Sequence, residues 1–184
     1  MVNGGSSGGL TPSALAFVDH WRALRNGKPV PTSQDFLDQV DPEFQPFVSF
    51  NDVEQSGRNV VALFGTGLVD LWKVDLTGKQ VNEFVDNERA DRLTVDMLRC
   101  AEKPCGIWEV STFRTTSGRV IGWEMISLPL VLDDPDRIRI ARYHNVLEPT
   151  EKDELIQDIL NFQQKEWVDL GFGEPDAKPL MKTP

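Results

Sequence analysis

The chain has 184 residues, a formal net charge of -10 at pH 7 and a hydrophobic content of 40%, which are ordinary values for one globular domain with flanking elements. No segment approaches the roughly 18 consecutive apolar residues of a membrane helix. Because nucleic-acid binding depends on neutralising phosphates, an acidic chain without a Lys/Arg tract is a poor match for DNA or RNA, so we expect neither nucleic acid nor membrane as a partner.

The N-terminus and the cysteines predict a cytoplasmic protein. Residues 1–11 are rich in Gly and Ser and lack the basic start and apolar core of a secretory signal, so we interpret them as a flexible lead. The two cysteines, Cys100 and Cys105, cannot build a disulfide framework. They also lack the C-x-x-C spacing of a zinc or redox site, so a reducing compartment and no metal are expected.

An amphipathic helix is predicted to start at residue 12. Thr11 can cap its first turn, Pro12 suits its first position, and Asn26-Gly27 ends it. Its apolar stripe consists of Ala14, Phe17, Val18, Trp21 and Leu24. Together with a Pro- and Asp-rich crossing segment, in which a short helical turn is expected at 34–39, it makes up an N-terminal region, 12–43.

A hairpin is predicted next, from residues 44–52 and 59–64, which are rich in β-formers and separated by a Gly-containing break. Short helical pieces follow. A longer helix is expected between residues 86 and 103, because Ala90, Leu93 and Met97 recur at helical spacing and Pro104 ends the pattern.

Three strand-like runs, 107–115, 120–132 and 137–146, are joined by short turns and predict an antiparallel meander. A C-terminal helix is expected over 148–170 because of its broad apolar face, followed by a flexible tail, 171–184. Strands that occur as a hairpin and a meander favour an α+β fold, with a five-stranded antiparallel sheet and helices on one face.

Three segments carry a resemblance to a known family. They are HWRALRNGKPVP (20–31), LFGTGLVDLW (63–72) running into DLTGK (75–79), and WEMISLPL (123–130). Over residues 14–148 the chain resembles the PAS domain family, in particular a bacterial subfamily of short proteins with one PAS domain and flanking helices. The resemblance implies a PAS-like domain over 44–147, with strand order 2-1-5-4-3 and middle helices that enclose a possible ligand pocket. It also implies sensing or protein interaction instead of catalysis.

The same resemblance allows cofactors to be considered. PAS domains that bind haem usually supply a His from the long middle helix, and residues 86–103 contain none. Flavin-binding light sensors carry a reactive Cys in an Asn-Cys-Arg motif, which is not the setting of Cys100. Haem and photoactive flavin are therefore disfavoured, and a small apolar or planar ligand is expected if a cavity exists.

Two sets of residues are candidates for binding. A possible pocket between sheet and helices is predicted at Trp72, Leu93, Met97, Trp108 and Trp123, although such side chains more often belong to a plain core. The N-terminal helix must bury its stripe on the domain or on a second chain. Since flanking helices commonly mediate dimerisation in the PAS family, a homodimer through Phe17, Val18, Trp21 and Leu24 is predicted.

Function has two competing interpretations. The leading one is a non-enzymatic PAS-domain sensor or adaptor in signal transduction, acting through a small ligand, self-association or a separate signalling partner. The alternative is a small cone-shaped α+β isomerase or hydratase that uses His144 with a carboxylate. Strand order and a buried His-carboxylate pair discriminate between them. The Gly65-Thr66-Gly67 segment lacks the third glycine of a dinucleotide loop and predicts a turn.

Overall fold

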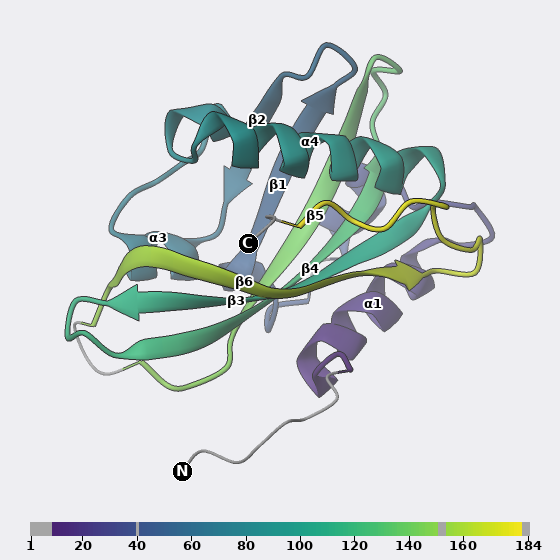
Figure 1. Ribbon diagram of the computed structural model, residues 1–184. Helices are drawn as coiled ribbons and strands as arrows, with labels where there is room; N and C mark the ends of the chain where they lie inside the picture. The colour runs from purple at the N-terminus through teal and green to yellow at the C-terminus, as the bar shows by residue number, and fades with distance from the viewer. Residues whose placement is uncertain (1–8, 40, 151–153, 182–184) are drawn as a thin grey trace.

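A six-stranded antiparallel sheet organises the molecule, which we analysed as a computed structural model that describes residues 9–39, 41–150 and 154–181 (Figure 1). Its order is β2-β1-β5-β4-β3-β6. The strands are β1 (Val48–Glu54), β2 (Asn59–Phe64), β3 (Cys105–Thr115), β4 (Val120–Val131), β5 (Arg137–Val146) and β6 (Ile156–Asp169). The helices are α1 (Pro12–Leu24), α2 (Ser33–Asp38), α3 (Thr66–Trp72) and α4 (Asn87–Glu102), with single 3-10 turns η1 (Gln45–Phe47) and η2 (Val81–Glu83).

The predicted strand order 2-1-5-4-3 is confirmed, and β6 extends the sheet beyond β3. The C-terminal helix predicted over 148–170 is wrong, because residues 156–169 form β6. Three register shifts explain the misleading pattern. Ile156 and Ile159 are three residues apart but pair with Thr115 and Phe113, which are two apart. An extra residue in one strand thus places apolar side chains at helical spacing on one face of a strand.

The helices cover both faces of the sheet. Helices α3 and α4 and the turn η2 lie over one face, whereas α1 crosses the other face behind β4 and β5 (Figure 1). The predicted Thr11 cap is present, and its side chain accepts a hydrogen bond from the Ala14 N–H. Thr11 also donates from its backbone and hydroxyl to the buried carboxylate of Glu124, which fixes the start of α1 to β4.

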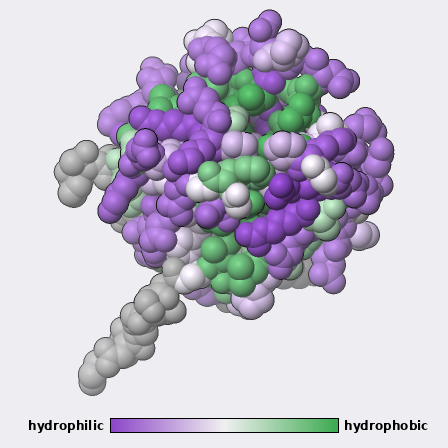
Figure 2. Space-filling view, turned by 90° about the vertical axis from the view of Figure 1, so that its right-hand side faces the viewer, coloured by the Kyte–Doolittle hydropathy of each residue, from purple (hydrophilic) through white to green (hydrophobic). Residues whose placement is uncertain are grey.

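The apolar stripe of α1 is buried within the single chain. Phe17, Val18, Trp21 and Leu24, the residues predicted to form a dimer surface, are between 0% and 3% exposed. The indole Nε1 of Trp21 also donates to the Pro129 carbonyl oxygen at 2.7 Å. A second copy therefore cannot use this stripe without detaching α1. The side shown in Figure 2 is mostly hydrophilic, with its apolar groups in separate patches.

The segment after β6 returns along α4 and β6 (Figure 1). Its backbone is hydrogen-bonded: the Trp167 indole donates to Ala177 O at 2.8 Å, and Leu180 N donates to Asp96 Oδ2 at 2.8 Å. These contacts place Ala177 and Leu180 against the rest of the chain, and the flexibility expected for the tail, 171–184, stays a prediction. Residues 182–184, and residues 1–8 of the expected lead, lie outside the described residues.

Candidate functional site

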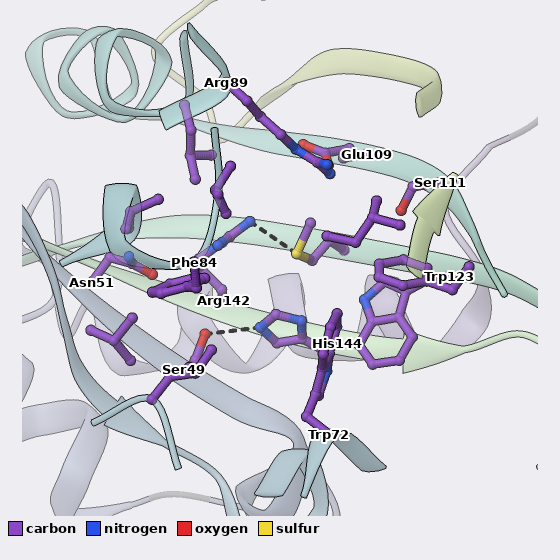
Figure 3. A pocket seen from close by; sticks show the side chains of 18 of the residues that line it. Ser49, Asn51, Trp72, Phe84, Arg89, Glu109, Ser111, Trp123, Arg142 and His144 are labelled. Carbon is purple, nitrogen blue, oxygen red and sulfur yellow. Dashed lines mark hydrogen bonds between the residues drawn. The ribbon is translucent and has the colours of Figure 1, made fainter. Parts of the chain in front are cut away.

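A cavity of about 200 Å³ lies between the sheet and the helices of one face (Figure 3). Its floor consists of strand residues: Ser49, Asn51, Val61, Phe64, Glu109, Ser111, Phe113, Trp123, Met125, Arg142 and His144. Its roof comes from α3, η2, α4 and the loops between them: Trp72, Val74, Leu76, Val81, Phe84, Val85, Arg89, Arg92 and Leu93. β6 and the tail close one side with Ile159, Lys165, Leu180 and Met181.

Sheet register brings the polar floor residues together. Ser111 pairs with Trp123, and Glu109 pairs with Met125, on β3 and β4. His144 on β5 pairs with the same Met125. Directly paired residues point to the same face of a sheet, and alternate residues along each strand share that face. The row therefore crosses the sheet on the cavity side.

Three aromatic rings form a wall at one end of the cavity. Phe113 and Trp123 have ring centroids 4.8 Å apart, and Trp72 meets them edge-on at 5.6 Å and 6.2 Å. These spacings are those of favourable aromatic pairs. The hydroxyl of Ser111 and the indole Nε1 of Trp123 are both buried and have no hydrogen-bond partner among the described residues.

Arg142 is the most unusual polar group of the cavity. Its Nε donates to Ser127 Oγ at 3.3 Å, and its Nη2 contacts the Met125 sulfur at 2.9 Å (Figure 3). Among the described residues no carboxylate forms an ion pair with it. Burial lowers the pKa of the guanidinium; Glu109 opposes this change, whereas the positive charge of Arg89 adds to it.

His144 lies beside Arg142 in the same row. Its Nε2 is 2.8 Å from Ser49 Oγ. Burial, followed by the nearby Arg142 charge, holds the pKa of His144 well below its ordinary value of 6.5, so the ring is neutral at pH 7. The described residues provide no carboxylate hydrogen-bonded to His144. The cavity carboxylate, Glu109, lies two strands away on β3.

The depressed pKa of His144 predicts a loss of stability in acid. Below pH 6.5 the unfolded chain binds a proton that the folded chain rejects until the lower folded pKa is reached, so the free energy of unfolding falls as the pH falls through this window. The slope from this one group is at most about 1.4 kcal/mol per pH unit. Urea unfolding at pH 7.5 and 5.5 should show a larger decrease for the native protein than for His144→Gln. Equal decreases would contradict the assignment.

The structure separates the residues predicted to line a pocket. Trp72, Leu93 and Trp123 lie at the cavity. Met97 faces a neighbouring apolar cluster with Cys100 and Ile107, and its sulfur accepts a hydrogen bond from Asn59. Helical spacing placed Met97 on the same side of α4 as Leu93, but one turn further along, where the helix closes directly onto the sheet.

Trp108 lies on the opposite face of the sheet. It is one residue from Glu109, so strand alternation turns it away from the cavity and under α1, where its Nε1 donates to Glu124 at 2.8 Å. The polar cavity residues Glu109, Ser111 and Arg142 were not identified from the sequence as pocket residues. The sequence did contain a signal for Glu109 and Ser111. They lie at every second position between the apolar Ile107 and Phe113, so all four side chains are on the same face of the strand.

Other candidate chemistry has a structural role. The Cys100 thiol is outside the cavity and donates to Cys105 O at 2.7 Å, and burial raises its pKa. Within the described ranges, no three His, Cys, Asp or Glu side chains are grouped to hold a metal ion.

The helices of the described part include none that is long and apolar enough to cross a membrane. Gly65 ends β2 and precedes α3, as the turn prediction required.

Comparison with known proteins identifies a matching family model and a similar solved structure. A family model described as a PAS domain matches residues 10–141. The crystal structure of the PAS domain of a protein from Colwellia psychrerythraea is similar over 61% of this chain and 97% of that chain, with 13% sequence identity and a TM-score of 0.41. No curated protein matches the chain.

Proposed function

Since the chain belongs to the PAS domain family, a family of sensing and signalling domains, we propose that it senses a small ligand through occupancy of its internal cavity. The observation that supports this most directly is the cavity itself, which is lined mostly by apolar and aromatic side chains with a few convergent polar groups. Such a lining is typical of small-molecule sites.

The tail provides a route from the ligand to a partner. Leu180 and Met181 form part of the cavity wall, and Leu180 N is bound to Asp96 of α4. A ligand that changes the packing of α4 or of these two side chains therefore changes a segment that also faces solvent, because Met181 is 39% exposed. We propose that a separate signalling protein reads this segment.

We also propose that the protein is bacterial and cytoplasmic and that it forms a homodimer. The burial of the α1 stripe means that a homodimer would have to use another surface. For the ligand we propose neither haem nor photoactive flavin, since α4 contains no His and Cys100 lies away from the cavity.

The sensor is better supported than the alternative isomerase or hydratase. The strand order is the PAS order, in which β1 lies inside the sheet. The enzyme hypothesis needs a His-carboxylate pair, and His144 is instead bonded to the Ser49 hydroxyl. Its depressed pKa also leaves a weak base at neutral pH.

Native mass spectrometry of protein purified from its own host, together with an absorption spectrum, tests the proposal. We expect a mass above that of the bare chain that disappears when the protein is denatured, and release of the same small molecule into the supernatant. The same spectrum reports the oligomeric state. A bare chain under every growth condition, with no stabilisation by any fraction of a host small-molecule extract, would contradict ligand sensing.

A further inference from the structure

We infer that the cavity binds a small planar carboxylic acid, with its carboxylate at Arg142 and its ring against the aromatic wall of Trp72, Phe113 and Trp123. This inference rests on the proposed ligand-sensing function and names the chemical class of the ligand. Three features support it: the partners of Arg142, the positively charged groups of the wall, and the size and donors of the aromatic end.

The partners of Arg142 do not satisfy its partly buried guanidinium. The group has five N–H donors in a planar fork that fits a carboxylate bidentately. Among the described residues, its hydrogen-bond partners are the Ser127 hydroxyl, at a long 3.3 Å, and the Met125 thioether, which is a weak acceptor. Even partial burial of a charge without a paired partner is unfavourable, so this arrangement favours an anion supplied by a ligand.

The charge on the cavity wall has the sign that such a ligand requires. The guanidinium groups of Arg89 and Arg142 share the wall with a single carboxylate, Glu109. The other two cations of the lining, Arg92 and Lys165, already form ion pairs with carboxylates of their own. Arg142 forms no ion pair with a carboxylate among the described residues, so the carboxylate of a ligand would match its charge.

The opposite end supplies donors for a second ligand oxygen. Ser111 Oγ and Trp123 Nε1 are buried and unpartnered among the described residues, and the indole is a donor only. The Ser111–Trp123 pair is two strand residues from the Glu109–Met125 pair, where the Arg142 guanidinium ends. Two strand residues span about 7 Å, which suits a benzene ring with a carboxylate on one carbon and a hydroxyl on the opposite carbon.

The volume also limits the ligand to about one ring. The cavity of about 200 Å³ exceeds the roughly 150 Å³ engineered cavity that holds benzene, and the additional space accommodates a carboxylate. The exposed side chains of Val74 and Phe84 line the same cavity, so ligand entry would be between α3 and η2.

Calorimetric titration with benzoate, 4-hydroxybenzoate and the neutral benzamide tests the inference. A charged hydrogen-bonded pair gives the acids an expected advantage of about tenfold or more over the amide. Arg142→Met has nearly the same length and should lose that advantage. Arg137→Met is the matched control, because Arg137 is on the same strand but pairs with Asp134 outside the cavity, and it should leave the advantage unchanged.

Two further variants make the test more specific. Ser111→Ala should remove any extra affinity for 4-hydroxybenzoate over benzoate while benzoate still binds. Arg142→Lys retains the charge without the planar fork and should bind benzoate several-fold more weakly than the native protein. This variant serves as the test if Arg142→Met does not fold.

Three results would overturn the inference: equal affinity for benzoate and benzamide, a carboxylate preference that survives Arg142→Met, or no binding of either acid at millimolar concentration. These results are distinguishable from failure of the sensing proposal. If the carboxylic acids fail but native mass spectrometry releases another small molecule, ligand sensing stands and only the ligand class is wrong.

Discussion

Replacing Asp96 with alanine should lower the free energy of unfolding by about 3–5 kcal/mol, because it leaves a buried ammonium without its counter-charge. The Lys165 Nζ is 2.7 Å from Asp96 Oδ2, and the two side chains are 6% and 0% exposed. The same carboxylate oxygen accepts a hydrogen bond from Leu180 N at 2.8 Å. Asp96 therefore connects α4 to β6 and to the tail at one point.

Urea unfolding followed by tryptophan fluorescence measures this loss. Asp91→Ala is the control, because Asp91 is exposed on the same helix, and its unfolding midpoint should match that of the native protein. The double variant Asp96→Leu with Lys165→Met removes both charges and should recover most of the loss, as apolar replacements of buried ion pairs often do. A loss below about 1 kcal/mol in Asp96→Ala would contradict the buried pair.

Trp21→Ala should lower the free energy of unfolding by a similar amount, about 3–5 kcal/mol, because it opens a cavity between α1 and the sheet. Trp21 is 0% exposed and donates to the Pro129 carbonyl oxygen at 2.7 Å. The variant loses the packing of the indole and also leaves that carbonyl without its donor. If α1 were instead a dimer helix, the substitution would change the oligomeric state.

Two controls separate these outcomes. Trp21→Phe retains much of the ring and should lose less, with about 1 kcal/mol from the missing hydrogen bond. Leu15→Ala alters an exposed apolar residue on the same helix and should leave the unfolding midpoint unchanged. Light scattering should give the same mass for all three variants as for the native protein. A native dimer that Trp21→Ala dissociates, with an unchanged midpoint, would refute the burial of α1 in one chain.

Local sequence signals predicted most of the elements well. The cap and first turn at Thr11-Pro12, and the alternation and turns that delimit β2 and β5, act through neighbouring residues, so they are readable without knowing the fold. The resemblance added the strand order. The confirmed order then follows from the pairing of those same strands.

The same local signals failed for β6. Apolar residues recur there at helical spacing, but the pairing with β3 contains three register shifts that bring such residues to one strand face. No local pattern reveals that the edge of β3 is available for pairing. The unpaired N–H and C=O groups of that edge favour a strand over a helix, and this depends on residues that lie between 41 and 64 positions earlier in the chain.

By itself, the sequence determined which segments are amphipathic, where most strands turn, and that three tryptophans would be buried or nearly so. Only the tertiary structure decided which side each faces: Trp123 and Trp72 at the cavity, and Trp108 beneath α1. It likewise decided that the α1 stripe is covered within one chain and that Arg142 lines the cavity. Burial and pairing are set by residues distant in sequence, and a side chain's chemistry there depends on the neighbours that the fold provides.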